Sequence, residues 1–131
     1  MKALDTNILV RFLTGDDSAA LVRVESLLCT AEEHNETFRV TDLVLLELLW
    51  VLRSSYQLDR SKILDAIEAL FNAAVLSFQS TESVNQFLVI GRATNLDLAD
   101  ILIGLNAQQQ GCETTHTLDK KAAQSEFFEE I

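Results

Sequence analysis

Four acidic residues occupy positions where a carboxylate needs a physical reason. Asp5 ends the short β-favouring segment "KALD" and Asp119 follows the segment "ETTHTL". Glu47 and Asp100 interrupt the apolar stretches "LVLLELLWVL" and "LDLADILIGL". A carboxylate moved alone into a dry core costs several kcal/mol, so such groups usually have a partner or a metal ion. These four side chains are therefore the first candidates for a chemical role.

Carboxylates that converge without a matching number of bases repel one another, and hard divalent cations such as Mg²⁺ or Mn²⁺ usually resolve the repulsion. The two cysteines, Cys29 and Cys112, have no CxxC spacing and no histidine at ligand spacing, so neither a zinc site nor a disulfide framework is indicated. A magnesium-type site favours phosphoryl chemistry, because the cations clamp phosphate oxygens and lower the pKa of a bound water.

Each acid also has a plainer interpretation. The two that follow strands can cap the helices predicted for "TNILVRFL" and "KKAAQSEFF". The two helical acids can be structural carboxylates paired with Arg11 or Arg53. For a single acid these interpretations are at least as good as function, but two helical acids together with two strand-end acids favour a shared cluster.

Helical spacing places both helical acids on faces that we expect to pack inward. The face around Glu47 contains Leu43, Leu46, Trp50 and Val51, and the face around Asp100 contains Leu96, Ile103, Gly104 and Ala107. Aspartate is also a poor residue for a helix interior.

The elements that position these acids alternate along the chain. Short strands are predicted at 2–5, 38–41, 75–79 and 113–118, each followed by helical periodicity. This order predicts an α/β fold with a short central parallel sheet of about four strands flanked by helices. The carboxyl ends of parallel strands form the edge where ligands bind in such folds, and two of the acids belong there.

Composition sets the outer limits. With 131 residues, 48% hydrophobic, 4 Gly and no Pro, the chain is expected to form one domain over 1–131. The start shows no apolar stretch of signal-peptide length, so we expect a soluble, cytoplasmic protein. The net charge of −10 argues against a broad electrostatic grip on nucleic acid, although bound divalent cations would reverse the sign locally.

Four segments together resemble the PIN-domain nucleases and, among them, the VapC-type toxins of bacterial and archaeal toxin–antitoxin pairs. They are "LDTNILVRFL", "TDLVLLELLWVLRSSY", "LDLADILIGLNAQQQG" and "TLDKKAAQ", which span essentially the whole chain and hold the acids in the family's order. Each segment alone is weakly specific, whereas the four at these spacings are strongly specific. Leu118 stands where many relatives have Phe, which we expect to alter packing rather than chemistry.

The resemblance implies a metal-dependent endoribonuclease with an α/β PIN-like fold. It implies that Asp5, Glu47, Asp100 and Asp119 are catalytic and hold one or two Mg²⁺ or Mn²⁺ ions, with Asp97 as an occasional ligand. Water activated by the metal would hydrolyse RNA phosphodiesters and leave a 5′-phosphate. The resemblance further implies a homodimer that a small antitoxin protein holds inactive.

Supporting residues are predicted beside the strand-end acids. Thr6, Asn7 and Thr117 can orient these acids by hydrogen bonds, as metal ligands generally require, and turn or cap chemistry is their alternative role. The candidates for RNA contact are the basic residues near the same acids, Arg11, Lys120 and Lys121.

Other classes of protein fit less well. A phosphohydrolase of the haloacid dehalogenase type needs a second Asp two residues after the first, where this chain has Asn7. A receiver domain needs an acidic pair near the N-terminus and a late Lys at a strand end, and neither is matched well. A PIN-domain RNA-processing nuclease that is not a toxin and a non-catalytic PIN-like binding module remain open, although the second has no need to keep all four acids together.

Overall fold

The computed structural model describes residues 1–131, which form two compact units, Met1–Gln79 and Ser80–Ile131. The chain contains six α-helices, five short strands and one 3₁₀ turn. None of the helices combines the length and the apolar character needed to cross a membrane. The predicted α/β class is confirmed.

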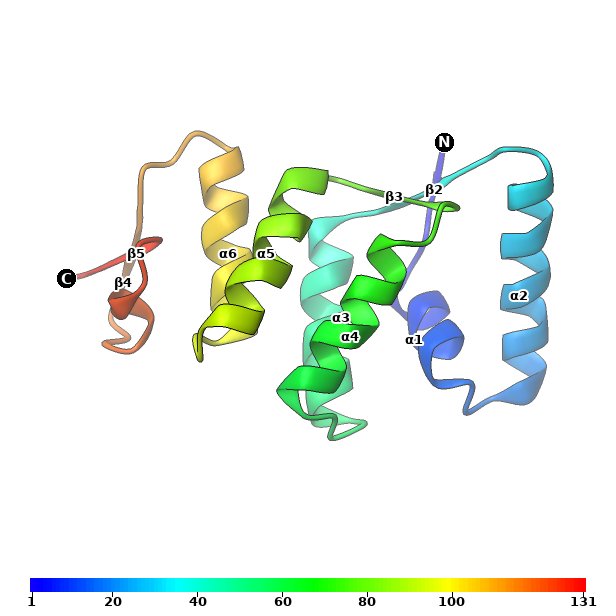
Figure 1. The fold of residues 1–131 in the computed structure, drawn as a ribbon, viewed down its shortest axis with the longest axis horizontal. Helices are drawn as coiled ribbons and strands as arrows, with labels where there is room; N and C mark the ends of the chain where they lie inside the picture. The colour runs from blue at the N-terminus through cyan, green and yellow to red at the C-terminus, as the bar shows by residue number, and fades with distance from the viewer. The chain divides into compact units, whose positions relative to one another are not determined.

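The first unit is a parallel sheet with its crossover helices (Figure 1). Its elements are β1 (Lys2–Ala3), α1 (Thr6–Thr14), α2 (Ser18–Glu33), β2 (Phe38–Val40), α3 (Asp42–Ser54), α4 (Arg60–Phe71) and β3 (Leu76–Phe78). The strands lie in the order β1-β2-β3, with Lys2 opposite Phe38 and Phe38 opposite Leu76. Both pairings are parallel, so each crossover requires helices.

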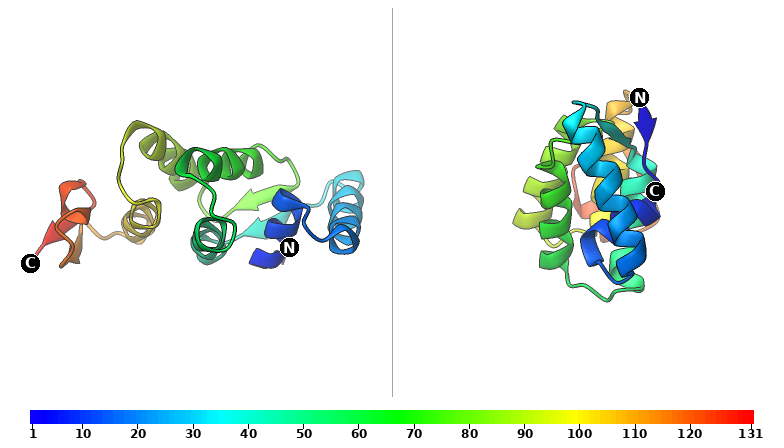
Figure 2. Two further views of the ribbon diagram at one scale, coloured as in Figure 1. Left: turned by 90° about the horizontal axis from the view of Figure 1, so that it is seen from below. Right: turned by 90° about the vertical axis from the view of Figure 1, so that its right-hand side faces the viewer.

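The core of this unit forms between the sheet and the apolar faces of the helices. Val40, Leu48 and Leu52 have no exposed surface. Helix α1 contacts α2 and α3, while α4 contacts α3 and β3. Figure 2 shows these elements from two further directions, with α2 nearest the viewer in the right-hand panel.

Side-chain caps begin three of the helices. Thr41 accepts a hydrogen bond from the Val44 amide at 3.4 Å, Asp17 from the Ala20 amide at 3.0 Å, and Ser80 from the Ser83 amide at 3.1 Å. Such caps satisfy amides that have no partner inside the helix. The helix predicted for "TNILVRFL" matches α1 to within one residue.

The second unit contains α5 (Thr81–Ala93), α6 (Leu98–Gln109), β4 (Thr115–Thr117), the 3₁₀ turn η1 (Ala122–Gln124) and β5 (Phe128–Glu130). Helices α5 and α6 contact each other. Strand β4 pairs in parallel with β5, with Thr115 opposite Phe128. The observed sheets thus have three and two strands, whereas one sheet of about four strands was predicted. The helix predicted for "KKAAQSEFF" was also wrong, because this segment forms η1 and the approach to β5 instead.

Gly104 allows the C-terminal segment to approach α6 closely. A Cβ atom built at Gly104 would lie 2.5 Å from the Phe127 Cβ, a distance that carbon atoms do not tolerate. Phe127 is itself buried, with 4% of its surface exposed. The absence of a side chain at Gly104 therefore lets the segment that follows Asp119 pack against the helix that carries Asp100.

Candidate functional site

In the first unit, Asp5 and Glu47 line the same hollow, which has a volume of about 380 Å³. Asp5 follows β1, and α3, which carries Glu47, begins directly after the neighbouring parallel strand β2. Parallel neighbours end at the same edge of a sheet, and Glu47 lies about one and a half helical turns into α3. The order of elements therefore brings this acid pair together. Thr6, Asn7 and Arg11 line the same hollow.

Asp5 is the N-cap of α1, as its plainer interpretation predicted. Its Oδ1 accepts a hydrogen bond from the Thr6 amide at 2.8 Å, and the Leu4 amide is held by the Arg39 carbonyl at 3.0 Å. The second carboxylate oxygen, Oδ2, has no hydrogen-bond partner. The cap thus fixes the orientation of the Asp5 carboxylate through Oδ1 and leaves Oδ2 available to bind a cation.

The predicted inward face around Glu47 was wrong. Leu43 and Trp50 are 79% and 66% exposed, Glu47 is exposed with them, and α3 packs through Leu45, Leu48, Leu49 and Leu52. Glu47 has neither an ion pair nor a hydrogen bond, so its predicted structural alternative, a pairing with Arg11 or Arg53, does not occur either. The helix is apolar on nearly every side, and periodicity could not choose which face would be buried.

The Thr6 hydroxyl is a polar atom that lacks a partner at this hollow. Thr6 is 4% exposed, and its Oγ1 has no hydrogen-bond partner. A buried hydroxyl left unpaired costs about 1–3 kcal/mol, so such groups usually have a ligand, an ion or a water as partner. The unpaired hydroxyl and the unused carboxylate oxygens of Asp5 and Glu47 together fit a hard, oxygen-binding cation.

A compact polar network holds Arg11 at the wall of the hollow. Arg11 Nη1 donates to Asp16 Oδ1 at 2.8 Å and to the Tyr56 hydroxyl at 3.2 Å. Hydrogen bonds from Tyr56 and Thr14, followed by the one from Arg11, lower the pKa of Asp16, and the hydrogen bond to Asp16 raises the pKa of Arg11. No sequence pattern indicated the contact between Asp16 and Tyr56, which lie 40 positions apart.

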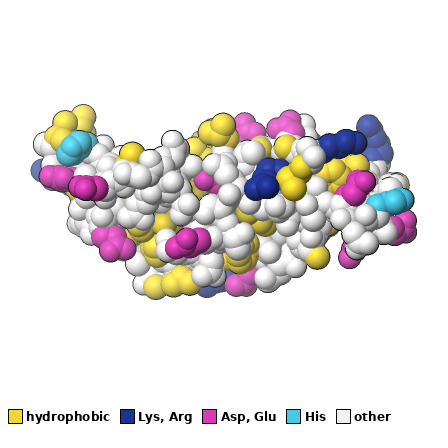
Figure 3. All heavy atoms as spheres, turned by 90° about the horizontal axis from the view of Figure 1, so that it is seen from above, with side chains coloured by type: hydrophobic (Ala, Val, Ile, Leu, Met, Phe, Trp, Pro, Cys, Tyr) yellow, Lys and Arg dark blue, Asp and Glu magenta, His cyan; other side chains and the backbone are white.

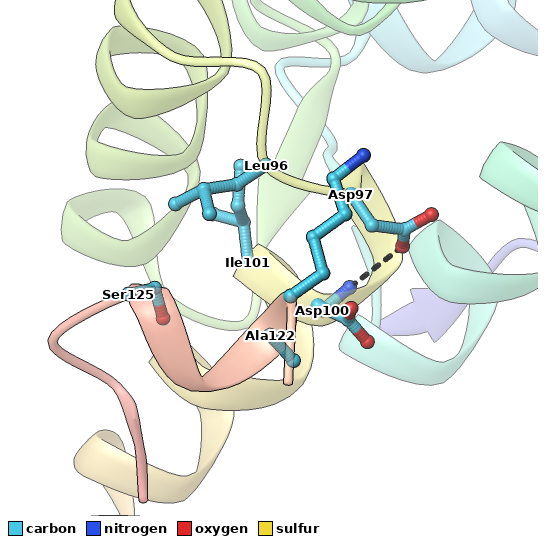
Figure 4. Close-up of a pocket in the computed structure, with 7 residues that line it drawn as sticks. Leu96, Asp97, Asp100, Ile101, Ala122 and Ser125 are labelled. Carbon is cyan, nitrogen blue, oxygen red and sulfur yellow. Dashed lines mark hydrogen bonds between the residues drawn. The ribbon is translucent and has the colours of Figure 1, made fainter. Parts of the chain in front are cut away.

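In the second unit, Asp97 and Asp100 line a small pocket with Lys121, Ala122 and Leu96. Asp97 is the N-cap of α6, and its Oδ1 accepts a hydrogen bond from the Asp100 amide at 3.1 Å. Figure 4 shows the two carboxylates close together on one side of the pocket, with Leu96 and Ile101 on the other side. The pocket volume of about 10 Å³ admits a water or an ion but no nucleotide.

Asp119 caps the turn that follows β4. Its Oδ1 accepts hydrogen bonds from the amides of Lys121 at 2.8 Å and Ala122 at 3.3 Å, and Oδ2 has no partner. The Asp119 amide donates to Thr117 Oγ1 at 3.0 Å, so Thr117 contacts the backbone of Asp119 rather than its carboxylate. The predicted cap role of Asp119 is observed, although the helix that was expected to follow Asp119 is not.

Burial raises the pKa of Asp100, and the negative charges of Asp97 and Asp119 raise it further. Asp100 is partly buried, whereas Ile103, which was predicted to share its inward face, is 41% exposed. Gly104 of the same predicted face is buried. The negative charges of Asp97 and Asp119 thus both repel that of Asp100, and a bound cation would relieve this repulsion.

We expect Asp100→Asn to raise the Tm near pH 7 and to lose this advantage in acid. A raised pKa means that folded Asp100 keeps its proton in a pH range where the unfolded chain has lost it. The free energy of unfolding therefore falls as pH rises from the ordinary aspartate pKa to the raised value. Asparagine does not ionise, so the variant does not lose this stability. Thermal unfolding at about pH 7 and about pH 3 measures the effect, with Glu126→Gln as the control for one lost charge. An equal change in Tm at both pH values would contradict the prediction.

Neither unit contains a group of three or more His, Cys, Asp or Glu side chains arranged to hold a metal ion. Each unit instead presents acids beside one of the predicted basic residues, Arg11 in the first and Lys121 in the second. Lys120 is exposed and lines neither hollow. Acidic side chains lie scattered over the face drawn in Figure 3, and Lys and Arg form no broad patch there.

In this α/β chain, acids thus follow β1 and β4 and lie on α3 and α6. Residues 2–127 match the PIN domain family, and the chain belongs to it. The chain is similar to a protein of Aquifex aeolicus (strain VF5) described as a VapC ribonuclease. The two are 22% identical over 111 residues, which cover 85% of this chain and 82% of the relative.

Proposed function

We propose that the chain is a metal-dependent endoribonuclease and the toxin component of a type II toxin–antitoxin pair. The observation that supports this best is the hollow where Asp5 and Glu47 keep unused carboxylate oxygens beside an unpaired Thr6 hydroxyl, in a chain of the PIN domain family. Similarity to a VapC ribonuclease supports RNA as the substrate.

We propose a single nuclease domain over 1–131 whose reaction needs all four acids. Asp5, Glu47, Asp100 and Asp119 would hold one or two Mg²⁺ or Mn²⁺ ions, with Asp97 as an occasional ligand. Bound there, a divalent cation supplies Lewis-acid polarisation of the phosphodiester and a water of lowered pKa.

The chain's own residues orient these acids. The Thr6 amide fixes one oxygen of Asp5, and the amides of Lys121 and Ala122 fix one oxygen of Asp119. The cap thereby sets the direction of the second oxygen of each carboxylate. Thr117 holds the backbone of Asp119, and Asn7 is an exposed group at the first hollow. Hydrogen bonds of this kind hold a metal-binding side chain in one orientation before the metal binds.

The same function implies partners and a location. We propose that the protein acts in the cytoplasm, forms a homodimer and is inhibited by a cognate antitoxin. A basic antitoxin side chain would suit a cleft lined by carboxylates.

A non-catalytic PIN-like binding module is the second candidate. It is favoured by one observation, namely that neither unit by itself contains a three-ligand metal group. A PIN-domain nuclease that processes RNA without being a toxin shares the proposed chemistry and differs only in its biological role.

We expect the purified protein to cleave structured RNAs with Mg²⁺ or Mn²⁺ and to stop when EDTA is added. Chelation removes the cation that the carboxylates would hold. Gel analysis of RNA fragments measures cleavage, and restoring excess Mn²⁺ is the control for damage by EDTA. Cleavage that continues in EDTA would rule out the metal mechanism. RNA binding without cleavage under any metal would favour the binding module.

A further inference from the structure

Arg11 is the one basic side chain that lines the hollow containing Asp5 and Glu47, and it pairs with neither of them. Its guanidinium contacts Asp16 and Tyr56 instead, at 2.8 Å and 3.2 Å. Asp5 and Glu47 are both exposed, so an ion pair with Arg11 would be only weakly favourable, and the network around Asp16 takes its place. The structure therefore holds Arg11 away from the acids.

Asp16 and Tyr56 reach Arg11 from separate segments. The Tyr56 hydroxyl donates to Asp16 Oδ2 at 2.6 Å, and the Thr14 hydroxyl donates to Asp16 Oδ1 at 2.9 Å. Asp16 follows Gly15, whose φ of 62° turns the chain sharply after α1, and Tyr56 lies in the loop after α3. The network consequently restrains the guanidinium from two sides.

Most of the Arg11 donors remain available. A guanidinium has five N–H donors, and the two on Nη1 are used by Asp16 and Tyr56, which leaves the three on Nε and Nη2 without a protein partner. A planar pair of donors on adjacent nitrogens matches the two non-bridging oxygens of a phosphate. In a chain with net charge −10, a phosphate ligand depends on such local contacts.

We propose that Arg11 binds a backbone phosphate of single-stranded RNA and that Asp16 and Tyr56 are positioning residues that orient Arg11 for this contact. The inference rests on the proposed ribonuclease function and names the group that holds the substrate at the same hollow. Asp16 and Tyr56 act through Arg11. They also keep it from neutralising Asp5 and Glu47, which leaves these acids free for a cation.

The test measures RNA binding apart from cleavage. A fluorescent single-stranded RNA oligonucleotide is titrated with protein by anisotropy, in Mg²⁺ and at several salt concentrations. All proteins carry Asp100→Asn, so that the RNA stays intact. Arg11→Gln is compared with Arg23→Gln, which removes the same charge from the exposed surface of α2. Thermal unfolding verifies that each variant is folded.

We expect Arg11→Gln to weaken RNA binding about tenfold and to reduce the slope of log Kd against log salt by about 0.7, the value for one phosphate contact on a single strand. Arg23→Gln should change neither quantity. Tyr56→Phe should weaken binding by a smaller factor, with no further loss when Arg11→Gln is already present. Arg11→Lys should keep the salt slope but bind more weakly than Arg11, because a lysine has no planar fork.

An unchanged salt slope in a folded Arg11→Gln protein would overturn the inference while leaving the ribonuclease function intact. Equal weakening by Tyr56→Phe with and without Arg11 would also overturn it, since Tyr56 would then act independently. If the Asp100→Asn protein binds no RNA and the unaltered protein cleaves none, the proposed function itself fails and the inference fails with it. The two failures are therefore distinguishable.

Discussion

Asp5→Asn is expected to lower the rate of RNA cleavage by about a hundredfold or more and to leave the free energy of unfolding almost unchanged. Asparagine keeps an oxygen that can accept the hydrogen bond from the Thr6 amide, and it is as good an N-cap as aspartate. It loses the negative charge, and removing one electrostatic group from a reaction centre typically costs about 10²–10³ in rate. Function and stability should therefore separate at this position.

Asp5→Ala is the matched comparison. It removes both the charge and the cap, so it should lose activity as Asp5→Asn does and also lose about 1 kcal/mol of stability. Cleavage rates with Mn²⁺ and denaturant unfolding measure the two effects. Cleavage by a folded Asp5→Asn protein at the unaltered rate would contradict the proposed role of this carboxylate.

Glu47→Gln should also lower the rate of RNA cleavage without lowering the free energy of unfolding, for a different reason. Glu47 is exposed on α3 and makes no ion pair, so its replacement removes no stabilising contact. A variant that unfolds but spares cleavage would make Glu47 a structural residue.

The local features of the fold could be read from the sequence. Thr41, Asp17 and Ser80 begin helices because a short polar side chain before an apolar periodic segment satisfies the first free amides. The positions of Asp5 and Asp119 after strands followed from the same local signals. Asp5 does cap α1 and Asp119 does cap the turn after β4, roles that were predicted as alternatives to a chemical function.

Features that depend on long-range pairing could not be read in this way. Nothing in the local pattern of 113–118 says that β4 pairs with β5 rather than with the first three strands. On α3, apolar residues surround the helix, so the pattern allowed two inward faces, and the packing selected that of Leu48 and Leu52. The hydrogen bond between Tyr56 and Asp16 joins two loops, and neither loop sequence indicates it.

Combining Asp5→Asn with Asp100→Asn is expected to slow cleavage no more than the more damaging of the two single changes. Asp5 belongs to the first unit and Asp100 to the second. If their carboxylates serve one reaction centre, either loss disables it and the second loss has little left to remove, as is found for groups that act as a unit. Independent contributions of the two carboxylates to one reaction would instead give losses that multiply.

The most direct measurement is therefore the rate of RNA cleavage with Mn²⁺ for four proteins: the unaltered chain, each single variant and the double variant, all verified as folded. The shared-site proposal predicts two strongly impaired single variants and a double variant whose rate lies close to the lower of them. A double variant whose loss equals the product of the two single losses, or single variants that cleave at the unaltered rate, would contradict it.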